Sequence, residues 1–128
     1  MPNAANDTRL RVLFVCAMNR WRSPTAEAMY RNDPRVAVRS AGVRQGARRP
    51  LSRVDLEWAQ ILVVMEREHL RRIREAFSDL PLPTVWTLDI PDDYRFMDPE
   101  LQELLRAALE PELKAVLNAA STDTDPSR

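Results

Sequence analysis

One cysteine and one arginine, six positions apart, are the residues of this sequence best suited to carry out a reaction. Cys16 is the first residue and Arg22 the seventh of a segment that reads CAMNRWRSP over residues 16–24. The planar guanidinium of an arginine matches two oxygens of a phosphate group, a geometry that lysine cannot reproduce. A thiolate beneath a phosphate held in this way is placed for in-line attack and for a phosphocysteine intermediate. The pair therefore indicates transfer of a phosphoryl group to Cys16.

The residues around this pair could form the anion site itself. Where a strand ends and a helix begins, unpaired backbone N–H groups and the positive end of the helix dipole face a bound anion. A loop of this length can wrap its N–H groups around a phosphate, and the Ser23 hydroxyl can donate to the thiolate. We therefore expect phosphate to contact Ala17, Met18, Asn19, Arg20, Trp21, Arg22 and Ser23. The alternative is that Cys16 ends a buried strand and is inert, as buried cysteines usually are.

Short apolar segments provide the strands that such a loop needs. Residues 12–16, 61–65 and 84–88 are apolar without alternation, which is typical of parallel strands buried on both faces. Residues 36–40 alternate apolar and polar side chains, which predicts a strand at the edge of the sheet. Cys16 ends the most apolar of these strands.

Helical signals lie between the predicted strands. Ser23 and Pro24 have the residue types of an N-cap and of the first helical position. Ser52 and Asp55 have the spacing of a capping box. Residues 66–77 carry an apolar stripe with helical period. We therefore expect a helix after each of the first three strands.

A last helix is predicted to begin at Asp98 and Pro99. Leucine and alanine side chains recur with helical period over residues 101–109. Proline lacks a backbone N–H and clashes with the preceding turn, so Pro111 is expected to kink or split this helix.

Alternation of strands and helices predicts a parallel sheet with helices on both faces. We expect a single α/β domain over residues 10–120, with a four-stranded parallel sheet in the order 2-1-3-4. Residues 1–9 and 121–128 are polar and unpatterned, and we expect flexible tails there. Ligands of such sheets bind beyond the carboxyl ends of the strands, which is where the loop after Cys16 lies.

The composition of the 128-residue chain argues against several classes of protein. Nineteen Lys and Arg residues balance nineteen Asp and Glu residues, which argues against a nucleic-acid-binding protein with a global basic field. One cysteine excludes an intramolecular disulfide and a cysteine-cluster metal site, and one histidine disfavours zinc catalysis. No apolar run suits a membrane span or a secretory signal, so we expect a cytoplasmic protein. No cofactor, metal, nucleic acid or membrane is expected as a partner.

The segment VLFVCAMNRWRSPTAEA, residues 12–28, resembles the phosphate-binding loop of the low-molecular-weight protein tyrosine phosphatase family, whose signature is Cys-x5-Arg-Ser-Pro. The resemblance continues through SAG at 40–42, ILVVME at 61–66 and IPDDY at 90–94, and so covers most of the chain. It implies metal-free hydrolysis of a phosphate monoester, such as a phosphotyrosine protein or a small aryl phosphate. Arsenate reductases that share the fold are the nearest alternative.

The resemblance also implies a role for each matching residue of the reaction centre. Cys16 matches the nucleophile, and Arg22 matches the phosphate-binding arginine. Asp92 matches the general acid, and Tyr94 matches an aromatic residue of the substrate cleft. Packing within its own loop is an alternative role for Tyr94.

Three further matches concern support of the loop. Asn19 matches the asparagine that adopts left-handed backbone, and Ser23 matches the serine bonded to the nucleophile. Ser40 matches the serine that supports the asparagine, so the resemblance implies a contact between Ser40 and Asn19.

Four differences from the family pattern bear on function. Met18 stands where a small residue is usual, and Trp21 replaces the second cysteine of eukaryotic members. Asp93 stands where proline is usual, which makes it a rival of Asp92 for the general acid. The segment over residues 42–49 is much shorter than usual. Two alternatives therefore stay open: a module that binds phosphorylated ligands with little turnover, and an arsenate reductase that uses an external thiol.

Other charged residues have simpler interpretations. Asp98 is expected to cap the last helix, and Asp89 is expected to lie in a solvated loop. His69 falls on the polar side of its predicted helix, where we expect it to be exposed. Arg48 and Arg49, in a short loop near the predicted site, could offer positive charge to an anionic ligand.

Overall fold

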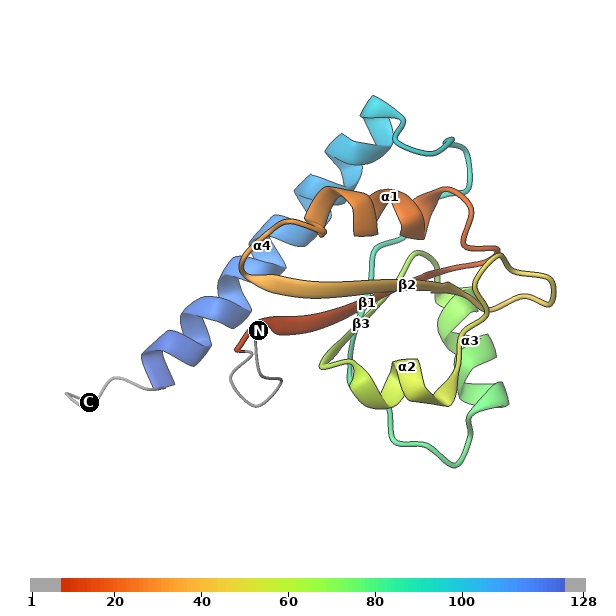
Figure 1. The fold of residues 1–128 in the computed structure, drawn as a ribbon, viewed down its shortest axis with the longest axis horizontal. Helices are drawn as coiled ribbons and strands as arrows, with labels where there is room; N and C mark the ends of the chain where they lie inside the picture. Colours follow the sequence, from red (N-terminus) through yellow and green to blue (C-terminus); the bar gives the residue numbers. More distant parts are fainter. Residues whose placement is uncertain (1–7, 124–128) are drawn as a thin grey trace.

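A computed structural model describes residues 8–123 of the chain. In chain order its elements are β1 (Leu10–Cys16), α1 (Arg22–Tyr30), β2 (Val36–Gly42), α2 (Arg53–Trp58), β3 (Ile61–Val64), α3 (Arg67–Ala76), β4 (Thr84–Thr87) and α4 (Pro99–Asp123). Strands and helices alternate throughout, as the sequence predicts (Figure 1).

The four strands form one parallel sheet in the order β2-β1-β3-β4, which confirms the predicted topology. β1 lies between β2 and β3, and its seven residues pair with all seven of β2. Cys16 lies opposite Gly42, and Val15 lies opposite Val64, so the first three strands end at one edge of the sheet. The loops that follow these strands therefore meet there.

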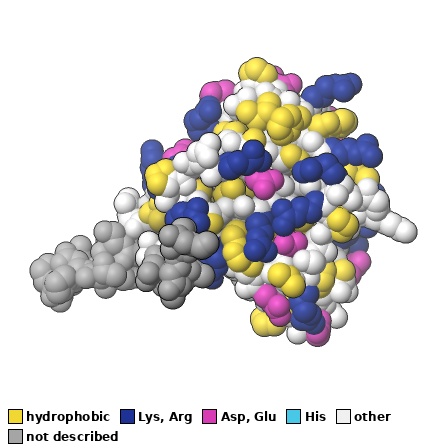
Figure 2. Space-filling view, in the orientation of Figure 1, with side chains coloured by type: hydrophobic (Ala, Val, Ile, Leu, Met, Phe, Trp, Pro, Cys, Tyr) yellow, Lys and Arg dark blue, Asp and Glu magenta, His cyan; other side chains and the backbone are white. Residues whose placement is uncertain are grey.

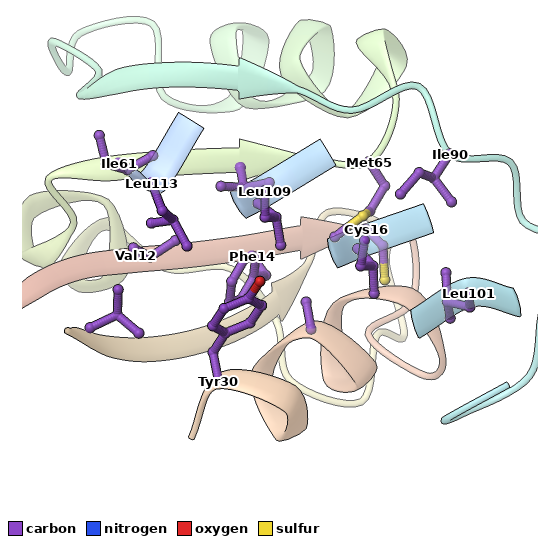
Figure 3. Packing of buried hydrophobic residues seen from close by; sticks show 14 residues of the cluster. Val12, Phe14, Cys16, Tyr30, Ile61, Met65, Ile90, Leu101, Leu109 and Leu113 are labelled. Atoms are coloured by element: carbon purple, nitrogen blue, oxygen red, sulfur yellow. The ribbon is translucent and has the colours of Figure 1, made fainter. Parts of the chain in front are cut away.

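Helices cover both faces of the sheet and bury both faces of β1. Phe14 and Cys16 of β1 belong to a cluster that packs against α1 and α4 (Figure 3). Leu13 and Val15, on alternate positions, belong to a second cluster that packs against α2 and α3. Because consecutive residues point to opposite faces, a strand buried on both faces must be apolar throughout, which is why β1 shows no alternation.

Two predicted details, one of the last strand and one of the first helix, differ in the structure. β4 was expected to be fully buried, but its residues are exposed or half-buried because it lies at the edge of the sheet. α1 begins at Arg22, with Trp21 as its N-cap residue, so Ser23 lies inside the helix and does not cap it. The physical reason is that the Ser23 side chain is buried and bonded to groups of the preceding loop.

The predicted capping box and apolar stripe are confirmed. The Ser52 hydroxyl accepts the N–H of Asp55, and the Asp55 carboxylate accepts the N–H of Ser52, at the start of α2. Ile73 of α3 is buried in the second cluster, and Leu70 packs beside it. Local sequence signals thus determine both elements on this side of the sheet.

The last helix is longer and more continuous than expected. α4 runs from Pro99 to Asp123 through Pro111 without being split, and it passes the expected domain boundary at residue 120. A proline at 111 removes one hydrogen bond to the carbonyl of Ala107, and this residue is exposed, so water can bind the carbonyl. Of the tails predicted at residues 1–9 and 121–128, residues 121–123 instead continue α4, and residues 1–7 and 124–128 lie outside the described residues.

The surface carries charges of both signs. Figure 2 shows basic side chains (Lys and Arg) interspersed with carboxylates on one face of the molecule, in keeping with the balanced composition. Among residues 8–123, no helix combines the length and the apolar character needed to cross a membrane.

The packing of α4 predicts opposite outcomes for two adjacent leucines. Leu105 is 0% exposed against the sheet, whereas Leu104 is 38% exposed. Leu105→Ala should lower the free energy of unfolding by about 2–5 kcal/mol because it leaves a cavity in the core. Leu104→Ala should cost about 0.5 kcal/mol or less. Urea denaturation measures both, and equal losses would contradict this placement of α4.

Candidate active site

The segment that follows β1 forms a loop at the edge of the sheet where the first three strands end. Cys16, the last residue of β1, is 3% exposed, and its side chain points into the cluster with Met65 and Ile90 around it (Figure 3). The loop runs from Ala17 to the start of α1 at Arg22. The structure therefore places the cysteine and the arginine at the two ends of one loop, as the sequence predicts.

The shape of this loop depends on Asn19. Its φ angle is 56°, in the left-handed region that asparagine tolerates better than most residues. Asn19 is 0% exposed, and its side-chain Nδ2 donates to Ser23 Oγ at 2.9 Å. The left-handed backbone and the bond to Ser23 agree with the expected part of Asn19 in shaping the loop.

A chain of short contacts connects Asn19 to the thiol. Ser23 Oγ lies 2.9 Å from Cys16 Sγ and 3.5 Å from the Ala41 carbonyl oxygen. A hydroxyl has one proton to donate, and the Asn19 amide already donates to this oxygen. Either Ser23 Oγ or Cys16 Sγ could donate in the contact between them, and a Ser23 proton directed at the sulfur would stabilise a thiolate.

Arg22 is the most deeply buried cation of the site. Its side chain is 2% exposed, and Nη1 donates to Glu66 Oε2 at 2.6 Å and to the Ile90 carbonyl oxygen at 2.8 Å. Its Nε is buried and has no hydrogen-bond partner among the described residues. One side of the guanidinium is thus anchored to the protein, and the other side retains an unused donor.

Of the acidic residues after β4, the structure brings Asp92 to the arginine. Asp92 Oδ1 lies 3.5 Å from Arg22 Nε, an ion pair without hydrogen-bond geometry. Asp89 is exposed, as expected, and Asp92 and Asp93 are exposed as well, but no ion pair within the described residues includes Asp89 or Asp93. The loop that carries Asp92 is held by the Ile90 N–H, which donates to the Met65 carbonyl oxygen at 2.9 Å.

Glu66 is a residue of the site that the sequence analysis missed. It directly follows Met65 beyond the end of β3, and its carboxylate anchors the Arg22 guanidinium. β3 pairs with β1, so the residues after the two strands lie close together. The sequence held a signal for it, since an acidic residue follows the apolar run of the neighbouring central strand.

His69 was expected to be exposed, and this expectation was wrong. The side chain is 3% exposed, and Nδ1 accepts the Glu66 backbone N–H at 3.1 Å, so the neutral ring carries its proton on Nε2. Burial, with a smaller contribution from the Arg22 charge, lowers the pKa of His69 to about 4. The ring stays neutral beside the arginine because a second buried cation there would be costly.

Ser40 has a different partner from the one that the resemblance implied. Its hydroxyl donates to Glu27 Oε1 at 2.5 Å, whereas the Asn19 amide binds Ser23. Ser40 is 0% exposed on β2, and Glu27 of α1 reaches it from the adjacent helix. Ser40 therefore links β2 to α1, and Asn19 is supported from elsewhere.

Aromatic and charged side chains also occur in this loop and in the segment that follows β4. The Arg95 guanidinium lies 5.8 Å from the centre of the Trp21 ring, and Arg20 is exposed. Tyr94 donates its hydroxyl to Glu100 Oε2 at 2.8 Å, and this bond raises the pKa of Tyr94. Among residues 8–123, no group of three or more His, Cys, Asp or Glu side chains could hold a metal ion.

Asp98 lies at the start of α4, as predicted. Its Oδ1 accepts the Glu100 N–H at 2.9 Å, which is the bond of a helix cap. This role accounts for Asp98 without any part in the site.

Comparisons with known proteins agree with this geometry. No protein-family model matches the sequence, and no curated protein matches it. A solved structure of a YwlE mutant from Bacillus subtilis is 27% identical, with a TM-score of 0.60, over 82% of this chain and 99% of that chain. A YwlE arginine phosphatase mutant with a phosphorylated active-site serine is 26% identical, with a TM-score of 0.61, over 82% of this chain and 96% of that chain.

A more distant structure shares the fold. A low-molecular-weight protein tyrosine phosphatase from Streptococcus pyogenes, SP-PTP, has a TM-score of 0.69 at 16% identity, over 83% of this chain and 92% of that chain. Fold and loop together define an α/β domain that holds a cysteine and an arginine at the two ends of the loop after β1. The chain is therefore similar in sequence and fold to the YwlE structures, and it shares the fold of low-molecular-weight protein tyrosine phosphatases.

The buried histidine predicts a pH dependence of stability. The folded pKa of about 4 lies below the ordinary value of 6.5, so the unfolded chain binds the proton first as pH falls. The contribution of His69 is complete above pH 6.5 and declines by about 3 kcal/mol on going to pH 4. His69→Asn keeps an acceptor for the Glu66 N–H but cannot titrate. The free energy of unfolding, measured with denaturant between pH 7.5 and 4, should show the extra decline only in the unmodified protein. Parallel pH curves for the unmodified protein and His69→Asn would contradict a lowered pKa of His69.

Proposed function

We propose that this protein hydrolyses phosphate monoesters, as a cysteine-dependent phosphatase of the protein tyrosine phosphatase type, through a phosphocysteine at Cys16. In this proposal Arg22 and the backbone N–H groups of residues 17–23 bind the phosphate, and Asp92 is the general acid. The neighbour with a phosphorylated active-site serine supports a covalent phosphoenzyme for this fold.

The buried Nε of Arg22, which has no hydrogen-bond partner among the described residues, carries this proposal. A polar atom hidden from water and left without a partner is unfavourable, so folded proteins rarely retain one outside functional sites. Here Arg22 follows the loop that begins at the thiol, and its anchored Nη1 leaves the opposite side of the fork for a ligand. A phosphate in the loop would accept from Nε and lie next to Cys16 Sγ.

The chemistry then follows in two displacements. Cys16 Sγ attacks phosphorus, an S–P bond forms, the P–O bond to the leaving group breaks, and Asp92 gives its proton to the departing oxygen. Asp92 next takes a proton from a water molecule, which attacks the phosphocysteine. The P–S bond breaks, the Cys16 thiolate returns, and inorganic phosphate leaves. Arg22 and the loop N–H groups stabilise the charge of the transferring group in both steps.

The substrate is a phosphorylated molecule, and we propose a phosphotyrosine protein or a small aryl phosphate. The half-buried Tyr94 is a candidate wall for an aromatic leaving group. The neighbour described as an arginine phosphatase adds phosphoarginine to the substrates to be compared. We also propose a cytoplasmic location, because a nucleophilic thiol needs a reducing compartment.

A pair of substitutions separates phosphoryl transfer from anion binding. Cys16→Ser leaves Arg22 and the loop backbone in place, so turnover of p-nitrophenyl phosphate should disappear while tungstate still binds. Arg22→Lys keeps the charge but loses the planar fork, so both turnover and tungstate affinity should fall by about 100-fold or more. Steady-state kinetics and calorimetry give both quantities. Substantial turnover by Cys16→Ser would exclude the phosphocysteine, and a few-fold effect of Arg22→Lys would exclude Arg22 as the phosphate ligand.

The general acid is tested with leaving groups of graded basicity. Expelling a phenolate without a proton is costly, because phenols have a pKa near 10. Asp92→Asn should therefore slow turnover by about 10²–10⁴-fold for poor leaving groups and only mildly for good ones. Asp93→Asn is the matched control and should show no such dependence. If Asp93→Asn shows it instead, the acid is Asp93, and if neither does, the interpretation as a binding module gains support.

A further inference from the structure

The loop of residues 43–49, called here the support loop, lies against the loop of residues 17–21 that follows β1, called here the phosphate loop (Figure 1). The N–H of Val43 donates to the carbonyl of Cys16 at 3.1 Å, and the N–H of Arg44 donates to the carbonyl of Ala17 at 3.0 Å. The contact is close: a Cβ on Gly42, just before the support loop, would lie 2.7 Å from the Ala17 carbonyl oxygen. Two consecutive carbonyls are thus bound by backbone alone.

Arg48 binds the next two carbonyls of the phosphate loop. Its backbone N–H donates to the Met18 carbonyl oxygen at 3.0 Å, and its side-chain Nε donates to the Asn19 carbonyl oxygen at 2.9 Å. Four carbonyls in a row, from Cys16 to Asn19, therefore have donors from the support loop. Only the one on Asn19 depends on a side chain.

A loop that turns its N–H groups toward an anion must turn carbonyls away from it, and those carbonyls need donors of their own. Within the phosphate loop, Asn19 is the residue with left-handed backbone. Such a strained conformation persists only where neighbouring groups hold it, so the bond to the Asn19 carbonyl matters for the shape of the loop. The same residue binds Ser23 Oγ, which lies 2.9 Å from the Cys16 sulfur. A change at Arg48 would thus reach the nucleophile through Asn19 and Ser23.

We propose that Arg48 is a positioning residue, which holds the phosphate loop in its anion-binding shape through the Asn19 carbonyl. This inference rests on the proposed phosphatase function for its kinetic readout, but its binding readout is independent of turnover. Arg48 touches no part of the substrate in this role, and its contribution is to keep the loop N–H groups aimed at the anion before the anion arrives.

Three variants test this role. Arg48→Met removes the donor and keeps the length of the stem and the backbone N–H. Arg48→Lys keeps the charge but lacks the planar Nε donor. Arg49→Met is the matched control, because Arg49 is the next exposed arginine and, within residues 8–123, its only ion pair is with Asp55 at 3.6 Å. Tungstate affinity by calorimetry, kcat and KM for p-nitrophenyl phosphate, and Tm are measured for each.

We expect Arg48→Met to lower tungstate affinity and kcat about tenfold or more, with KM changed less and Tm no lower than in Arg49→Met. The tungstate affinity and kcat of Arg48→Lys should lie between those of Arg48→Met and of the unmodified protein. Those of Arg49→Met should stay within about twofold of the unmodified protein. Equal effects of Arg48→Met and Arg49→Met, or full activity of Arg48→Lys, would overturn the proposal. If the unmodified protein binds tungstate without turnover, the phosphatase function fails and the affinities alone decide on Arg48. If it binds no tungstate, both proposals fail.

Discussion

The burial of the Arg22 guanidinium is the constraint around which the site is arranged. A cation that is 2% exposed must be surrounded by oxygen atoms, because burying an unpaired charge lowers the free energy of unfolding by roughly several kcal/mol. Glu66, beyond β3, and the Ile90 carbonyl, beyond β4, supply two of these oxygens on one nitrogen. Their supply requires β1, β3 and β4 to end at one edge of the sheet. The parallel topology meets this requirement, and the donor that stays free defines where an anion would bind.

The position of Asp92 follows from the same charge. Its carboxylate lies 3.5 Å from Arg22 Nε, on the side of the guanidinium that the protein leaves without a hydrogen bond. A phosphate dianion bound there would repel an ionised Asp92, so binding of substrate favours the protonated form of this acid. A general acid needs that proton when the leaving group departs. In the proposed function, Arg22 would therefore bind the substrate, and the charge of the bound substrate would help to keep the acid protonated.

Backbone groups impose a second requirement on the phosphate loop. In the proposed function its N–H groups bind the ligand, so its carbonyls need partners on the opposite side, and the short support loop after β2 supplies them. Pairing of Cys16 with Gly42 brings the two loops together at the end of neighbouring strands. Because Gly42 has no side chain, the support loop can approach the phosphate loop at a distance that a Cβ would prevent. The sheet register thus determines how closely the two loops pack.

Much of this architecture could be predicted from the sequence, because it depends on local patterns. The apolar run that ends at Cys16, the capping box at Ser52 and the spacing from Cys16 to Arg22 each report on neighbours in the chain. Parallel pairing then follows from the alternation of strands and helices, and it places the phosphate loop at the correct edge of the sheet. The choice of Asp92 came from the family resemblance, and the structure places this residue beside Arg22.

Tertiary structure alone decided the partners of the buried polar groups. Helical period put His69 on a polar face, yet that face lies against Glu66 and Arg22, so the ring is buried and its pKa is lowered. Ser40 was matched to Asn19 by resemblance, but the hydroxyl meets Glu27 because α1 packs beside β2. These contacts join residues distant in the chain, and their geometry depends on how helices and loops pack on the sheet. Residue types and spacing therefore determined the fold and the reactive pair, whereas three-dimensional packing determined which residues hold that pair in place.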